Sequence, residues 1–89
     1  MDWNHVHIPR EDNLPLYLQL AATIRNLIAE KKLLPLEQIP VSRELQKRFF
    51  LSSVTVEKGI SRLVEEKYLF RRPRIGTFVS ENPPSARIR

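Results

Sequence analysis

Two stretches of the sequence carry side chains suited to contacts with a phosphate-bearing polymer. The first is a group of short hydroxyl side chains followed by a lysine: Ser52, Ser53, Thr55 and Lys58. The second is Arg72-Pro73-Arg74, in which two guanidinium groups flank a proline whose fixed φ stiffens the chain. Hydroxyls donate hydrogen bonds to phosphate oxygens, and cationic groups neutralise phosphates. These residue types predict binding of a polyanion rather than catalysis.

Catalytic and metal-binding chemistry find less support in the sequence. The carboxylates Glu57, Glu65 and Glu66 have no His or Lys paired with them in a pocket, so we expect them on solvated helix faces. His5 and His7 could share a metal on a strand, but no third ligand lies nearby. We therefore expect no metal, no cofactor and no enzymatic activity. The chain has no cysteine, which excludes a disulfide scaffold and a cysteine-ligated zinc finger.

The charge is concentrated in the second half of the chain. Residues 43–89 hold eleven Lys and Arg against five Asp and Glu, whereas residues 1–42 hold four against five. A basic half favours nucleic acid over a membrane, because no predicted helix combines a broad apolar face with a Lys-rich one. A basic surface that only keeps the protein soluble is the alternative. No apolar run approaches the ~20 residues that span a bilayer, and we expect a soluble, cytoplasmic protein.

Proline positions and apolar periodicity predict the elements that hold these side chains. Residues 1–14 lack periodicity and are predicted to form an N-terminal arm. A helix is expected to begin at Pro15 and to end at Pro35. Gln19 and Arg25 lie off its apolar stripe. The stripe has three- and four-residue steps and consists of Leu16, Leu20, Ile24, Leu27 and Ile28.

Two shorter helices and a hairpin are predicted after Pro40. Ser42 precedes a helix of about two turns marked by Leu45, Phe49 and Phe50, and Ser52 is the expected N-cap of the next. That third helix has a buried stripe, Val56, Ile60, Leu63 and Val64, and a glycine, Gly59, that predicts a close packing contact.

The last apolar runs have β propensity. Residues 68–71 and 76–79 are predicted to form a hairpin with an arginine-rich loop, and residues 36–42 no more than an isolated bridge or edge segment. Residues 80–89 are expected to be a linker. The predicted fold is therefore mainly α with a small β wing: a three-helix winged helix-turn-helix whose third helix presents its N-terminal N–H groups outward.

The sequence resembles the N-terminal DNA-binding domain of the GntR family of bacterial transcription repressors. The similarity covers residues 15–79 and keeps the order and spacing of four motifs: Pro15-Leu16-Tyr17, Pro40 followed by Arg43-Glu44-Leu45, Ser52 with Thr55-Val56, and Arg71-Arg72 before Gly76-Thr77-Phe78-Val79. The resemblance implies a winged helix-turn-helix that binds DNA.

The resemblance also implies roles for individual residues. Arg43 matches the family's arginine that reaches a guanine edge. Ser52 and Thr55 match positions that touch phosphate or base, and Gly76 matches the last wing glycine, whose backbone approaches the minor groove. Tyr17 is suited either to a phosphate contact or to packing. From their own chemistry, the predicted DNA-binding set also includes Ser53, Lys58, Arg72 and Arg74, while Lys47, Arg48 and Arg62 stay ambiguous.

Several positions depart from the family pattern. Ser53 stands where the family usually has arginine, and Glu57 where it often has a basic residue. A bidentate Arg–guanine contact contributes ~1–3 kcal/mol of discrimination, so Ser53 predicts a different target or weaker reading. Family glycines are replaced by Lys31, Leu36, Phe50, Lys67 and Arg74. Phe50 lies in a turn where positive φ suits glycine, which predicts a strained or rebuilt turn.

The expected function is operator reading by a bacterial repressor, with the third helix in the major groove and the wing at the minor groove of double-stranded DNA. The resemblance implies a dimeric full-length protein and a palindromic operator, whereas the domain alone is expected to be monomeric or weakly dimeric. The alternative is a winged-helix protein-interaction module, which Ser53 and Glu57 favour because they leave the third helix without arginine at its start.

Overall fold

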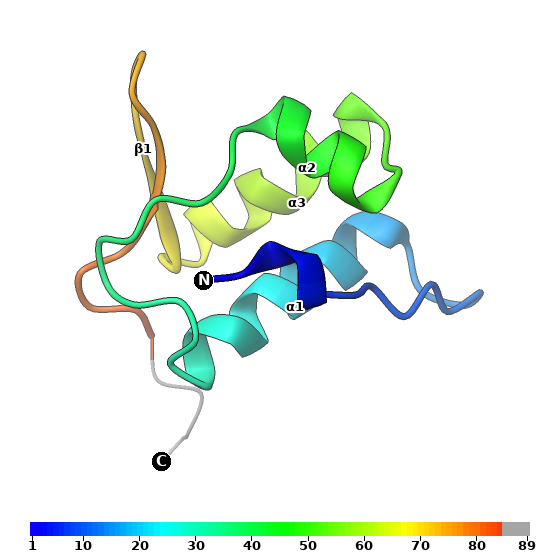
Figure 1. Ribbon diagram of the computed structural model, residues 1–89, viewed down its shortest axis with the longest axis horizontal. Helices are drawn as coiled ribbons and strands as arrows, with labels where there is room; N and C mark the ends of the chain where they lie inside the picture. The colour runs from blue at the N-terminus through cyan, green and yellow to red at the C-terminus, as the bar shows by residue number, and fades with distance from the viewer. Residues whose placement is uncertain (85–89) are drawn as a thin grey trace.

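The computed structural model describes residues 1–84 and confirms the predicted fold class. A short 3-10 helix, η1 (Trp3–His5), precedes α1 (Leu16–Ala29), α2 (Ser42–Phe49) and α3 (Ser53–Glu65). Strands β1 (Leu69–Arg72) and β2 (Gly76–Val79) form a two-stranded antiparallel sheet, the wing. The wing stands at one end of the helical part of the molecule, with its tip pointing away from α1 (Figure 1).

Helices α1 and α3 pack closely because a glycine lies at their contact. A Cβ atom at Gly59 would lie 3.0 Å from both the Tyr17 carbonyl oxygen and a Leu20 side-chain carbon, which confirms the predicted close contact. The three α-helices, both strands and the loops before α2 all contribute to the core. The largest of its fully buried side chains are Leu20, Ile24, Leu33, Ile39, Leu45, Val56, Leu63, Leu69 and Val79. Burying one such side chain contributes about 1.5–3 kcal/mol.

A lysine in the left-handed region lies two residues beyond the last residue of α1 and of α3, Lys31 with φ 62° and Lys67 with φ 71°. The N–H of Lys32 then donates to the carbonyl of Leu27 at 2.9 Å, which satisfies a carbonyl that the helix leaves free. The prediction that Pro35 ends the first helix is therefore wrong. The chain leaves the helix at Lys31, before the proline is reached.

The turn between α2 and α3 keeps a positive φ without glycine. Phe50 has φ 55° and its side chain is 86% exposed, whereas Phe49 is buried. Phe50, expected among the residues that mark the second helix, instead caps the end of α2 in the left-handed region and turns its side chain outward. A left-handed L-residue costs roughly 1–2 kcal/mol, so the turn is strained rather than rebuilt.

Residues 1–14, predicted to be an arm, lie against α1 and α2 (Figure 1). The side chain of Val6 is buried in the core, and the ring of Trp3 packs edge-on against Phe49 with centroids 6.4 Å apart. The Arg48 guanidinium donates to three carbonyl oxygens of this segment at 2.7–3.0 Å: those of Trp3, Asn4 and Val6. These contacts tie the segment to the end of α2.

Gln19, which lies off the predicted apolar stripe of α1, is buried. Its side-chain oxygen accepts from the N–H of Glu11 at 3.0 Å. Its amide nitrogen donates to the carbonyl oxygens of Glu11 at 2.9 Å and Leu14 at 2.6 Å. The buried Gln19 amide thus supplies hydrogen-bond partners for backbone groups of the chain that enters α1.

The wing is paired from Leu69↔Val79 to Arg72↔Gly76, and its first strand begins one residue later than predicted. The rings of Phe70 and Phe78 stack across it with centroids 5.6 Å apart. An isolated bridge joins Gln38 to Phe78, which confirms the bridge expected before α2. Of the predicted linker, residues 85–89 lie outside the described residues.

Candidate nucleic-acid interface

The start of α3 is fixed by the hydroxyl of Ser52. Ser52 Oγ accepts from the N–H of Thr55 at 3.1 Å and donates to Thr55 Oγ1 at 2.9 Å. Ser52 is thus the N-cap, as predicted, and its hydroxyl hydrogen is directed at its neighbour. Ser53 is exposed and has no such bond within residues 1–84. Of the predicted site residues here, Ser53 offers the free hydroxyl and Ser52 holds the helix end in place.

Helix α2 presents two cations to solvent. Arg43 and Lys47 are exposed on the outer face, four residues apart, while Leu45 between them is buried. Neither forms an ion pair within the described part of the chain. The sequence left Lys47 ambiguous, because only the burial of Leu45 and Phe49 shows which face of so short a helix is free.

Lys58 lies on α3 with its ammonium 4.7 Å from the centroid of the Tyr17 ring. The ring is half-buried between the helices, so the packing interpretation of Tyr17 is the one that the structure supports. A cation above a ring face contributes about 0.5–1 kcal/mol at an exposed site. Tyr17 therefore restricts where the Lys58 ammonium can lie without removing its charge.

The tip of the wing carries Arg72 and Arg74, both exposed and both without an ion pair within residues 1–84. Arg74 has φ 67°, and the N–H of Ile75 donates to the Arg72 carbonyl at 3.0 Å, which closes the turn. Gly76 follows with φ 144°, and a Cβ there would collide with the Gln38 side chain. The backbone conformation itself thus favours glycine at this position, because L side chains rarely adopt a φ of 144°.

Glu57 and Arg71 form an ion pair that sequence reasoning missed. Arg71 Nη2 lies 2.7 Å from Glu57 Oε2 and also donates to Ser61 Oγ at 3.0 Å. Glu57 lies on the second turn of α3 and Arg71 on β1, so the pair joins the helix to the wing. The sequence carries one signal for this pair. Glu57 stands where the family often has a basic residue, and Arg71 belongs to a motif that the family shares.

The N-terminal part of α2, helix α3 and the wing meet around one small hollow of about 200 Å³. Its lining includes Ser42, Glu57, Arg71, Gly76 and Thr77, which come from all three elements. Figure 1 shows the wing tip and the first turns of α2 and α3 along the same edge of the molecule. The structure therefore brings the three predicted contact elements to one side.

Glu66 forms two ion pairs, one with Arg62 of α3 and one with Arg25 of α1 that joins the two helices, and its expected place on a solvated face is only partly right. Arg62 Nε lies 2.8 Å from Glu66 Oε2 and Arg25 Nη2 lies 3.1 Å from Oε1. The hydrogen bond from Arg62 is the main cause that lowers the pKa of Glu66, and Arg25 adds to it. The same bond raises the pKa of Arg62.

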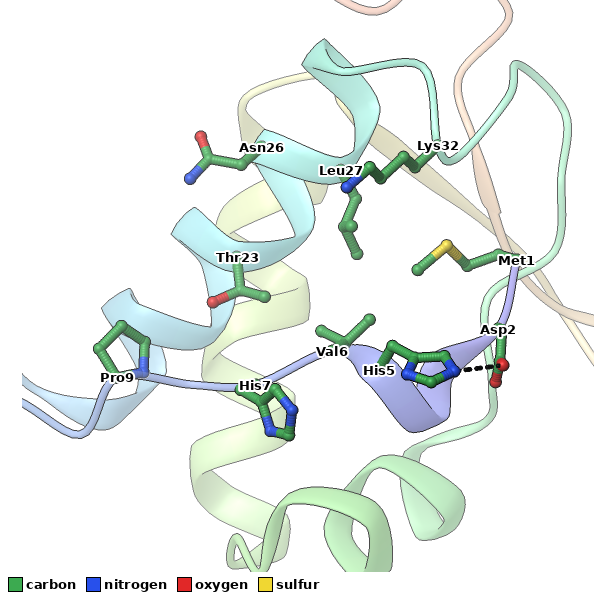
Figure 2. A pocket seen from close by; sticks show the side chains of 10 residues that line it. All are labelled: Met1, Asp2, His5, Val6, His7, Pro9, Thr23, Asn26, Leu27 and Lys32. Carbon is green, nitrogen blue, oxygen red and sulfur yellow. Dashed lines mark ion pairs between the residues drawn. The ribbon is translucent and has the colours of Figure 1, made fainter.

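A larger hollow, about 480 Å³, lies away from this side, between residues 1–9 and α1 (Figure 2). His5 and His7 both line it, and His5 Nε2 lies 3.2 Å from Asp2 Oδ2. Among residues 1–84, no three His, Asp or Glu side chains lie close enough together to hold a metal ion. No helix in the same range is long and apolar enough to cross a membrane.

Comparison with known proteins identifies the family. The sequence pattern described as "Bacterial regulatory proteins, gntR family" matches residues 16–79. The chain is 35% identical over 79 residues to the arabinose metabolism transcriptional repressor of Geobacillus stearothermophilus, covering 89% of this chain and 22% of the repressor. It is 40% identical over 67 residues to the mannosyl-D-glycerate transport/metabolism system repressor MngR of Escherichia coli, covering 75% of this chain and 28% of MngR.

Solved structures agree with this assignment. YtrA from Sulfolobus acidocaldarius, a GntR-family transcription factor, superposes with a TM-score of 0.81 at 31% identity, covering 86% of this chain and 81% of YtrA. The DNA-binding domain of AraR in complex with operator ORX1 superposes with a TM-score of 0.75 at 34% identity, covering 85% of this chain and all of that domain. The chain spans about a quarter of the length of the curated repressors that it matches.

Proposed function

The chain belongs to the gntR family of bacterial regulatory proteins, and we propose that residues 15–79 read an operator in double-stranded DNA. The observation that carries the proposal is the distribution of free cations. Arg43, Lys47, Arg72 and Arg74 are exposed and have no ion pair within residues 1–84. They belong to the elements that meet around the hollow between α2, α3 and the wing. Unpaired cations on one side are the footprint expected for phosphate binding.

In this proposal α3 enters the major groove and the wing lies at the minor groove. The start of α3 is slim, because Ser53 and Thr55 are small, and its free N–H groups carry a partial positive charge. Arg43 lies on the outer face of α2, where a guanidinium can reach a guanine edge. Arg72 and Arg74 project from a turn closed by the Ile75 N–H, so docking costs the wing little conformational freedom.

The wider proposal concerns the protein that contains this domain. The matched repressors are several times longer than the chain, so we propose that residues 80–89 lead toward an effector-binding and dimerising domain. Two domains related by a two-fold axis would then read a palindromic operator. The domain alone is expected to be monomeric or weakly dimeric. Sedimentation that shows a tight dimer at micromolar concentration would contradict that expectation.

The test is the salt dependence of binding. Affinity for duplex DNA is measured by fluorescence anisotropy at several salt concentrations, for the wild type and for the double variant R72A/R74A. Each phosphate contact contributes ~0.9 to the slope of log K against log salt, so the double variant should lower its magnitude by about 2. A double variant of two exposed lysines at helix ends, K31A/K67A, is the control and should keep the wild-type slope.

The slope separates DNA binding from a winged-helix protein-interaction module. Binding that weakens steeply as the salt concentration rises supports DNA recognition. Negligible affinity for duplex DNA even at low salt would support the protein-interaction module instead. An unchanged slope in R72A/R74A would remove the wing from the interface while leaving α2 and α3 in it.

A further inference from the structure

The outward face of α3 differs from a purine-reading helix. Its first eight residues, 53–60, include no Arg, Asn or Gln, and Lys58, their one side chain of a type that pairs with guanine, has its ammonium 4.7 Å from the Tyr17 ring centroid. Ser53, Val54, Glu57 and Lys58 instead line a shallow groove together with Ser42 of α2. Val54 is 65% exposed, which places an apolar side chain in the middle of the surface that would meet the bases.

The carboxylate of Glu57 is held by one oxygen and open at the other. Arg71 Nη2 at 2.7 Å and Ser61 Oγ at 3.3 Å both bind Oε2. Within residues 1–84, Oε1 accepts no hydrogen bond, and the side chain is 57% exposed. The pair with Arg71 offsets the negative charge that would otherwise repel DNA phosphates. Glu57 therefore presents a fixed acceptor to the groove.

We propose that Glu57 and Val54 make α3 a reader of pyrimidines, an inference that rests on the proposed DNA binding. Oε1 of Glu57 accepts a hydrogen bond from the N4 amino group of cytosine, and Val54 packs against the 5-methyl group of thymine. Cytosine offers a donor at the groove edge, whereas guanine offers only acceptors that repel a carboxylate. Adenine has a donor too, but its N7 acceptor lies beside it, so a carboxylate prefers cytosine.

Arg71 is a positioning residue in this proposal. It binds Glu57 and Ser61 from β1 through Nη2, and its role is to hold the Glu57 carboxylate at the α3 surface. Its replacement should leave Glu57 both free to rotate and uncompensated in charge. The R71M variant is therefore expected to lose the cytosine preference and to bind every duplex more weakly.

The first experiment compares base preference in E57A and the wild type. Each protein selects duplexes from a random pool, and affinities for single-base variants of the selected site follow. We expect the wild type to prefer cytosine at one position by about tenfold, the ratio that one good base contact provides. E57A should lose this preference and bind random duplex more tightly, because Arg71 then loses its carboxylate partner and its charge is free to attract phosphates. E65A, an exposed carboxylate near the other end of α3, should change neither.

The second experiment removes the methyl group from the DNA. In the selected duplex each thymine is replaced in turn by deoxyuridine, which lacks the 5-methyl group. The wild type should lose several-fold affinity at one position, and V54A should bind both duplexes equally. Retained salt-dependent binding with an unchanged base profile in E57A and V54A overturns this inference alone. Absence of salt-dependent binding to any duplex overturns the proposed function and this inference with it.

Discussion

Two groups of arginines in this molecule differ in the partners that the protein gives them. On the side of residues 1–14, Arg48 donates to three backbone carbonyls, and Arg10 donates to the carbonyls of Phe49 and Phe50. On the side of the wing and α2, Arg43, Arg72 and Arg74 have no such partner within the described residues.

The difference teaches that an arginine's role follows from whether the protein itself supplies acceptors. A guanidinium carries five donors and stays charged at any physiological pH. Where backbone carbonyls meet those donors, the side chain becomes part of the fold. Where none are present, the donors remain for a ligand, and phosphate or guanine acceptors fit them. The following predictions test this division.

The largest effect is expected from Arg48. R48A removes three hydrogen bonds from a charged donor and frees residues 1–6 from the end of α2. Hydrogen bonds to charged groups contribute ~1.5–3 kcal/mol each when buried, and partial exposure reduces the sum, so the free energy of unfolding should fall by about 2–3 kcal/mol. Urea denaturation measures it. K47A, at the neighbouring exposed position, should change stability by less than about 0.5 kcal/mol. Equal values for the two variants would contradict the division.

The next effect concerns Arg43 and has the opposite signature. R43A should leave the free energy of unfolding nearly unchanged and weaken binding to the selected operator by ~1–3 kcal/mol, with little change on random duplex. The measurement is a pair of titrations at one salt concentration. Equal losses on both duplexes would make Arg43 a phosphate contact rather than a base-reading residue.

The third prediction concerns the turn that joins the two sides. Phe50 has φ 55° and an exposed side chain, so its phenyl group contributes little burial while its backbone is strained. F50G should raise the free energy of unfolding by about 1 kcal/mol, because relief of strain exceeds the added entropy of the unfolded glycine. K47G, a glycine inside α2, should lower it by a similar amount. A fall in stability for F50G would show that the exposed ring makes a stabilising contact.

The helices, the wing and much of the core follow from the sequence alone, because they depend on local signals. The apolar stripe of α3 follows from its helical period. The Ser52 cap and the Gly59 contact follow from single residue types. Gln19 and Arg48 could not be placed in this way. Gln19 binds chain that lies outside its own helix, and Arg48 binds chain more than forty residues away.

The candidate site divides along the same line. The sequence locates Arg43, Ser53, Arg72 and Arg74 on open surface, since exposed basic and hydroxyl residues follow from the apolar pattern around them. It does not reveal the Glu57–Arg71 pair, which exists only because β1 folds back along α3. The contact between Gly76 and the Gln38 side chain depends in the same way on the chain before α2.

The smallest effect is the pH dependence contributed by Glu66. Its pKa in the folded protein is lowered from 4.5, mainly by the hydrogen bond from Arg62 and further by Arg25. A carboxylate with a lowered folded pKa adds stability that is complete above its unfolded pKa and is lost as pH falls through the folded value. The pairs are substantially exposed, so the contribution should stay below about 1 kcal/mol.

Urea unfolding near neutral pH should therefore show wild type more stable than E66Q by that amount. The gap should close on acidification below 4.5. Glu65 has no ion pair within residues 1–84, so the stability of E65Q should match that of the wild type at every pH. A gap between wild type and E66Q that persists at acid pH would show that Glu66 acts through packing and not through charge.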